Sequence, residues 1–150
     1  MMLIAPIAGK AADRVGERIP IMAGFILAAT GFTLLGLTVT ATGGYLTIAG
    51  PLLLAGVGVG LAVPTTVSAS LRAVSPQQVG LASGVGSTLQ NIGGVVGVVT
   101  ATAVFAGAGS YLSPAGFVHG LRPALLALAA LAALGALAGH AVRHPAATSQ

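Results

Sequence analysis

The chain has 150 residues, of which 55% are hydrophobic and 5% are charged, whereas soluble domains contain about 25% charged residues. This composition excludes a water-soluble globular fold and predicts a membrane protein. The net charge of +4 comes from six basic and two acidic residues, too few for nucleic-acid binding, and the absence of Cys excludes disulfides and thiolate metal sites.

The fold class follows from the length of the apolar runs. A membrane-spanning helix needs about 20 apolar residues. The alternating polar positions of a membrane β-barrel are absent from the sequence. We therefore predict an all-α, polytopic transmembrane helical bundle with four complete spans and the end of a fifth.

The first nineteen residues divide into an apolar part and a charged part. Residues 1–8 are apolar, but at 1.5 Å per residue they cover only about 12 Å of the ~30 Å bilayer core. We expect them to be the end of a truncated span that belongs to a longer protein. Residues 9–19 hold five of the chain's eight charged side chains. Because charge is costly in hydrocarbon, this segment is predicted to be a loop in water.

Four spans are predicted within a transmembrane region over residues 20–142. Their expected ranges are about 21–41, 46–68, 78–105 and 117–142. Pro20 suits the first turn of the first helix, and Ser75 to Gln78 has the form of a capping box before the third. Residues 143–150 are predicted to be a cytoplasmic tail.

The second and third spans contain small and polar residues at positions that would lie inside the membrane. The second span has Gly56, Gly58, Gly60 and Pro64, and the third has Gln90, Asn91, Gly93, Gly94 and Gly97. Small residues let helices approach closely, and amides in a bilayer face protein or water. These positions are therefore candidates for a substrate path or for helix packing. For the two amides, substrate contact and an interhelical hydrogen bond both remain open.

The distribution of basic residues predicts the orientation. With the spans above, five basic residues fall on one side of the membrane: Lys10, Arg14, Arg18, Arg72 and Arg143. Arg122 falls on the other side, where it is interpreted as a snorkelling or interfacial residue. Cytoplasmic loops carry the excess of Lys and Arg. Residues 9–19, 69–77 and the C-terminus are therefore predicted to face the cytoplasm across the inner (plasma) membrane.

The charged segment resembles a loop motif of the major facilitator superfamily, G-x-L-A-D-R-x-G-R-R. The matching residues are Gly9, Ala12, Asp13, Arg14, Gly16 and Arg18. Ala11 stands in place of the motif's Leu, and Glu17 in place of the first Arg of its terminal pair. Residues 51–64, 80–84 and 89–97 are similar to the C-terminal half of the 14-span drug:proton antiporter branch, with Gln90-Asn91-Ile92 where that motif has Arg-Gln-Leu.

The resemblance implies the C-terminal part of a secondary active transporter, a proton-coupled multidrug or small-molecule exporter that works by alternating access. It also implies a cytoplasmic gating motif made of Gly9, Asp13, Arg14, Gly16 and Arg18. The expected partners are the lipid bilayer, the missing N-terminal spans, a small-molecule substrate and protons. The alternative is a non-transporting membrane interaction fragment, a split half or gene remnant, that must associate with a partner bundle. An autonomous four-helix exporter is disfavoured because no span contains Asp, Glu or Lys.

Catalysis, cofactor binding and metal binding have no support in the sequence. No pairing of a nucleophile with a base, or of two carboxylates, lies within the spans, so the chain is not expected to be an enzyme. The glycines at 56, 58 and 60 lack the third Gly of a dinucleotide-binding loop. The three His residues are scattered, so neither a metal nor another cofactor is expected.

Overall fold

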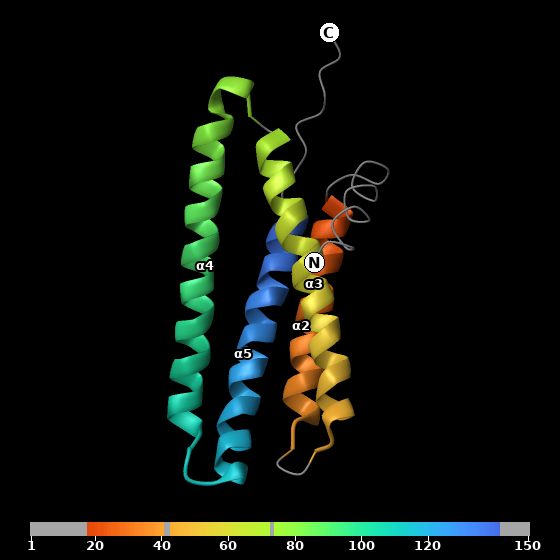
Figure 1. Ribbon diagram of the computed structural model, residues 1–150, viewed down its shortest axis with the longest axis vertical. Coiled ribbons are helices and arrows are strands. Elements are labelled where there is room, and N and C mark those ends of the chain that lie inside the picture. Colours follow the sequence, from red (N-terminus) through yellow and green to blue (C-terminus); the bar gives the residue numbers. More distant parts are fainter. Residues whose placement is uncertain (1–17, 41–42, 73, 142–150) are drawn as a thin grey trace.

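The computed structural model describes residues 18–40, 43–72 and 74–141, and within these ranges all regular structure is helical (Figure 1). The elements are α2 (Arg18–Thr38), α3 (Tyr45–Arg72), the short 3₁₀ helix η1 (Pro76–Gln78), α4 (Val79–Ala108) and α5 (Pro114–Ala141). Each of the four α-helices is long and apolar enough to cross a membrane. The predicted all-α transmembrane fold class is therefore confirmed.

The four long helices run up and down in sequence order. The connections from α2 to α3 and from α4 to α5 lie at one end of the molecule, at the bottom of Figure 1. The connection from α3 to α4, which includes η1, lies at the opposite end together with the start of α2 and the end of α5. The start of α2 and the connection from α3 to α4 therefore lie at the same end of the bundle.

Local hydrogen bonds decide where the helices begin and end relative to the apolar runs. Helix α5 begins at Pro114, three residues before the apolar run that starts at 117. The Ser113 Oγ accepts a hydrogen bond from the Gly116 N–H (3.0 Å) and so caps the first turn. Helix α3 continues past 68 to Arg72. Its polar last turns keep their hydroxyls satisfied internally, because the Ser70 Oγ donates to the Thr66 carbonyl (2.9 Å).

The capping box predicted at 75–78 is wrong in one respect. Ser75 has the extended backbone of an N-cap residue, with φ −68° and ψ 156°, and Pro76 follows it as the first helical residue. The Ser75 side chain, however, makes no capping hydrogen bond. The Gln78 N–H donates instead to the Ser75 carbonyl (2.9 Å) and closes a 3₁₀ turn, so the backbone already satisfies the donor that a capping box would pair.

Helices α2 and α3 pack with their backbones almost in contact. Small residues line both sides of this crossing: Gly24, Ala28 and Gly31 on α2, and Ala55, Gly58 and Ala62 on α3. A Cβ added at Gly24 would lie 2.7 Å from the Ala62 backbone N, and one added at Gly58 would lie 2.6 Å from the Gly24 carbonyl oxygen. Only residues without a larger side chain allow this separation, which is a common way for membrane helices to associate.

Helix α5 covers a second side of α2. Leu35 of α2 and Val39, the residue after α2, pack with Leu125 of α5 in the buried cluster of the bundle. Farther along the interface, a Cβ added at Gly135 would lie 2.9 Å from the Phe25 ring. Gly135 and Gly139 both face α2, where their nearest neighbours are Phe25, Ile21 and Met22. Helix α2 is thus held between α3 and α5.

Arg122 of α5 joins that helix to the C-terminal end of α2. Its Nε and Nη2 atoms donate to the Val39 carbonyl at 3.1 and 2.9 Å, across 83 residues of sequence. Val39 follows the last residue of α2, so its carbonyl belongs to the set that a helix leaves unpaired at its C-terminus. The interpretation of Arg122 as a snorkelling residue misses this contact, because the guanidinium binds the end of a neighbouring helix.

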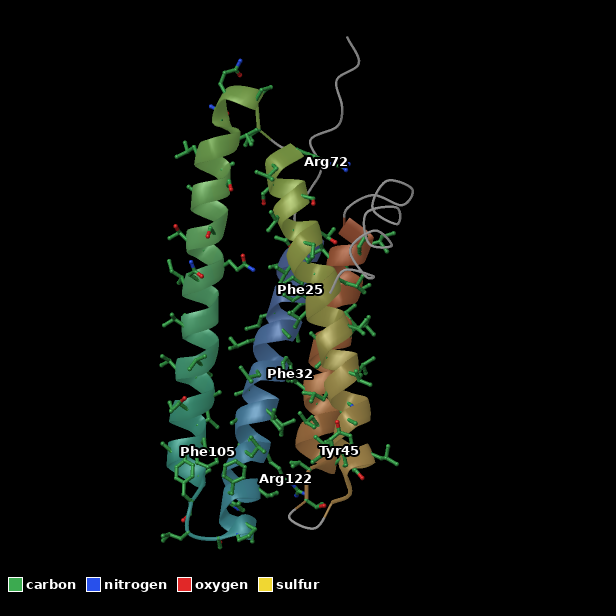
Figure 2. All side chains as sticks on the ribbon, viewed as in Figure 1. Phe25, Phe32, Tyr45, Arg72, Phe105 and Arg122 are labelled. Carbon is green, nitrogen blue, oxygen red and sulfur yellow. The ribbon has the colours of Figure 1, made fainter. Side chains whose placement is uncertain are left out.

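Helix α4 is the least buried of the four. Of its thirty residues only Phe105 is buried. The Phe105 ring lies 4.9 Å from the Tyr111 ring and 5.3 Å from the Phe117 ring, centroid to centroid. This cluster ties the end of α4 to the start of α5, at the same end of the molecule as Arg122 (Figure 2). Towards the opposite end, α4 stands beside α3 across a groove.

Candidate functional site

A groove of about 420 Å³ lies between α3 and α4, and α2 contributes one residue to it. We call it the α3/α4 groove. It is lined by Phe25, Ala62, Val63, Thr66, Val67, Ser70, Leu71, Ala82, Ser83, Gly86, Ser87, Leu89 and Gln90. Its volume falls within the roughly 300–1,000 Å³ of small-molecule sites. The groove lies in the half of the bundle that contains the connection between α3 and α4.

The polar residues of the groove form two rows, one on each wall. Thr66 and Ser70 lie four residues apart on α3, so they share one face of that helix. Ser83, Ser87 and Gln90 lie at spacings of four and three on α4, and they also share one face. Apart from these five residues the lining is apolar. The arrangement is typical of a small-molecule site, where a few polar groups orient a ligand held by apolar contact.

Local bonding fixes what the α3 row can offer a ligand. The Thr66 Oγ1 donates to the Ala62 carbonyl (2.8 Å), and the Ser70 Oγ donates to the Thr66 carbonyl (2.9 Å). Each hydroxyl proton is therefore engaged within α3, while the oxygen lone pairs remain able to accept. The α3 wall is a row of hydrogen-bond acceptors.

The two amides singled out in the sequence have different surroundings. Gln90 lines the α3/α4 groove, and it also borders a shallower concavity of about 390 Å³ that includes Asn91 and Gly94. Both amides are exposed. Among the residues that the structure describes, neither amide side chain hydrogen-bonds to another residue. The structure thus places Gln90 at the groove and Asn91 on the adjoining face of α4.

The glycines of the second span divide between two faces of α3. Gly58 is buried against α2, where an added Cβ would meet the Ala28 backbone N. Gly56 and Gly60 lie on the other side of α3, and an added Cβ at either would have no atom within 4 Å. Pro64 is exposed and, lacking an N–H, leaves the Gly60 carbonyl without its usual helical partner. Gly58 therefore serves packing, whereas Gly56, Gly60 and Pro64 lie on open surface.

The glycines of the third span lie mostly on open surface as well. An added Cβ at Gly93 or Gly94 would have no atom within 4 Å. One at Gly97 would lie 3.9 Å from a methyl group of Leu128 on α5, an ordinary packing distance. Of this group, Gly97 faces a neighbouring helix and Gly94 borders the shallower concavity.

Sequence reasoning missed most of the lining of the groove. Thr66, Ser70, Ser83 and Ser87 are unremarkable in a span, because hydroxyls pair readily with their own helix. The signal that could have found them is their spacing, since polar residues three or four apart mark one face. Phe25 on α2 gave no such signal. It reaches the groove only through the crossing of α2 and α3.

The gating motif cannot be placed from the structure. Gly9, Asp13, Arg14 and Gly16 lie outside the described residues, and Arg18 is described only as the first residue of α2. Within the described ranges, no three His, Cys, Asp or Glu side chains come together as a metal site. His119 is engaged otherwise, with its Nδ1 2.9 Å from the Ala108 carbonyl oxygen.

Comparison with known proteins gives one match. The family model described as Major Facilitator Superfamily matches residues 1–149, nearly the whole chain. No curated protein and no solved structure matches the chain.

Proposed function

The chain belongs to the major facilitator superfamily, a family of membrane transporters, and from that premise we propose that it acts in the proton-coupled export of small amphipathic molecules by alternating access. In this proposal it forms the C-terminal part of a secondary active transporter related to the 14-span drug:proton antiporter branch. The observation that carries the proposal is the α3/α4 groove, whose apolar walls and five polar residues suit a small amphipathic ligand. The family match does not favour the alternative of a non-transporting interaction fragment.

The proton carrier of this mechanism comes from outside the chain's helices. The two acidic residues of the chain, Asp13 and Glu17, both lie in the 9–19 segment. A carboxylate that carries protons must sit inside the membrane and reach water on both sides in turn. We therefore assign that role to further N-terminal spans, which would pack against the exposed faces of α3 and α4. Gly56, Gly60, Asn91 and Gly93 lie on those faces, open to such a partner.

The charged segment is assigned the role of a cytoplasmic gate. In this proposal Asp13 pairs with an Arg and with the N-terminus of a partner helix in one transport state, and the contact breaks in the other. Gly9, Gly16, Arg14 and Arg18 belong to the same motif and are assigned to the same gate. The position of Arg18 at the start of α2 supports a loop at the same end of the bundle as Arg72.

The positive-inside rule assigns the end of the bundle that contains the start of α2 and Arg72 to the cytoplasm. The described part of the chain is a multi-pass membrane bundle, and we place it in the inner (plasma) membrane. Arg72 lies at the end of the molecule where α2 begins, and Arg122 lies at the opposite end (Figure 2). This separation supports the five-to-one distribution of basic residues expected from the sequence.

Proteoliposomes test the transport proposal. The full-length protein that contains this chain is reconstituted with an acidic lumen, and uptake of radiolabelled chloramphenicol, a neutral amphipathic probe, is measured. We expect uptake that collapses when a protonophore dissipates the pH gradient.

The same assay tests the proposed gate. Asp13→Asn should slow the initial rate of uptake by about tenfold, the effect of losing roughly 1.4 kcal/mol from a gating contact. The matched control is Lys10→Gln, which removes a charge from the same loop outside the motif positions. Uptake that is indifferent to the pH gradient would contradict proton coupling, and equal rates in the two variants would contradict the gate.

A further inference from the structure

We propose that the α3/α4 groove selects uncharged amphipathic molecules that carry hydrogen-bond donors, and that it rejects permanent cations. The inference rests on the proposed function for its biological role, since it names the substrate class of that exporter. It concerns equilibrium binding by the groove itself, which can be measured without transport.

The lining of the groove carries no charge. None of its thirteen lining residues is ionisable in the physiological range. A cation that enters an apolar site without a carboxylate loses hydration that the site does not replace.

The aromatic residue of the lining does not reverse this preference. Phe25 is half-buried, and its ring lines the groove and lies 2.9 Å from the position that a Cβ at Gly135 of α5 would take. A cation over a phenylalanine ring gains about 0.5–2 kcal/mol, and no carboxylate in the lining adds to that attraction. Phe25 therefore serves as an apolar floor, suited to a flat neutral group.

The two walls of the groove differ in the hydrogen bonds that they can form with a ligand. The α3 row accepts hydrogen bonds, because the Thr66 and Ser70 hydroxyl protons are held by carbonyls of α3. Across the groove, Gln90 presents an amide that both donates and accepts and that has no partner among the described residues. A ligand that satisfies both walls carries a hydroxyl or amide N–H towards α3 and a polar group towards Gln90. Its remaining surface is apolar, to match the Val, Leu, Ala and Phe side chains between the rows.

A matched pair of probes tests the proposal. Radiolabelled chloramphenicol is neutral and carries hydroxyl and amide donors, whereas radiolabelled tetraphenylphosphonium is a permanent cation without donors. Equilibrium binding of each is measured to the full-length protein in lipid nanodiscs, with empty nanodiscs subtracted. We expect chloramphenicol to bind at least about tenfold more tightly than the cation, the effect of one unsatisfied polar group or more.

Variants on α4 assign this binding to the groove. Gln90→Leu, which keeps the side-chain size and removes the amide, should weaken chloramphenicol binding by about tenfold. Ser87→Ala should weaken it less. Thr88→Val is the matched control, because Thr88 adjoins Ser87 but lies outside the lining and bonds its hydroxyl to the Gly84 carbonyl. Gln90→Glu, measured at pH 8, should introduce tetraphenylphosphonium binding, and this gain also shows that the variant is folded.

The outcomes separate the inference from the transport proposal. Tighter binding of the cation than of chloramphenicol by the native protein would overturn the inference, as would Gln90→Leu behaving like Thr88→Val. Proton-driven uptake that persists alongside either result would leave the transport proposal standing. Conversely, groove-dependent chloramphenicol binding without any uptake in proteoliposomes would support the inference and contradict the export function.

Discussion

At the scale of single residues, Arg122 of α5 forms a side-chain contact with the end of a distant helix, α2. Two of its guanidinium nitrogens share one acceptor, the Val39 carbonyl, at 3.1 and 2.9 Å. A cation at a helix C-terminus also interacts favourably with the helix dipole, by about 0.3–1 kcal/mol at exposed sites. Val39 itself is buried, so its carbonyl has little access to water as a substitute partner. Arg122 therefore contributes both a hydrogen-bond cap and charge compensation to α2.

Replacement of Arg122 by Met tests this contribution. The variant keeps an unbranched apolar stem but loses both donors, so we expect it to lower the free energy of unfolding by about 1.5–3 kcal/mol, the range for hydrogen bonds to charged groups. Arg122→Lys should lie between Met and the native residue, because one ammonium can replace one of the two bonds. The measurement is a denaturant titration in mixed micelles. If the Met variant unfolded at the same denaturant concentration as the native protein, the contact would contribute nothing to the free energy of unfolding.

At the scale of the elements, the crossing of α2 and α3 determines which face of α3 remains for a ligand. Ala55, Gly58, Ala62 and Thr65 form the buried stripe of α3. The groove residues Val63, Thr66, Val67 and Ser70 follow on the adjoining face of the same helix. Burial of one stripe against α2 therefore orients the acceptor row towards α4. A change at the crossing would move the wall of the groove with it.

Two glycines two residues apart on α3 test this division. Gly58→Ala places a methyl group against the Ala28 backbone, 2.6 Å from the Gly24 carbonyl oxygen. Backbone cannot yield as a flexible side chain can, so we expect a loss of about 1–3 kcal/mol, the usual cost of overpacking. Gly56→Ala meets no atom within 4 Å and should be neutral or stabilising by a few tenths of a kcal/mol, because Ala favours helix more than Gly. The same micelle titration compares the two. Equal destabilisation by both substitutions would contradict the crossing.

The sequence predicts the existence of the helices better than their faces. Long apolar runs identify four spans, because length and hydropathy alone decide whether a helix crosses a bilayer. These helices are apolar on every side, so periodicity does not distinguish the face of Gly58 from that of Gly56 or Gly60. The same limitation left Gln90 and Asn91 equivalent in the sequence. The position of α3 beside α4 distinguishes them, because Gln90 lines the groove between these helices and Asn91 does not.

At the scale of the whole molecule, the connections gather at two opposite ends of the bundle. Gly44 lies in the connection between α2 and α3, and Leu112 lies in the connection between α4 and α5. Both are exposed, Leu112 at 97%. Ser75, in the connection between α3 and α4, lies at the other end (Figure 1). The chain contains no Cys, so single cysteines at these positions report the sidedness of each end without background from this chain.

Cysteine labelling in intact cells tests the proposed orientation. With a membrane-impermeant maleimide added outside, Gly44→Cys and Leu112→Cys should react at once, because their ends of the helices face outwards. Ser75→Cys should react only after the membrane is permeabilised. Permeabilised cells serve as the control, since all three positions must then react. Immediate labelling of Ser75→Cys alone would reverse the orientation and remove the cytoplasmic assignment of residues 69–77.

The candidate site shows why the assembled structure was needed. Its polar residues come from α3 and α4 and its floor from α2, and Phe25 and Gln90 are separated by 64 intervening residues. The pattern of residues along one helix does not predict that two residues so far apart in the sequence line the same groove. The contact between Arg122 and Val39 is similarly remote. The membership of a residue in a membrane span was predictable from the long apolar runs. The role of a residue that acts where distant helices cross was not predictable from the sequence.

The contact between Arg122 and Val39 also has a consequence for biogenesis. Within the described part of the chain, α2 and α3 are synthesised before α4 and α5, and their small-residue crossing can form as soon as α3 has entered the bilayer. The hydrogen bonds from Arg122 to the Val39 carbonyl cannot form until α5 is synthesised. The arrival of α5 supplies the guanidinium to α2 and the aromatic partner Phe117 to α4 in one step. Insertion of α5 therefore completes contacts of both α2 and α4 within the described bundle.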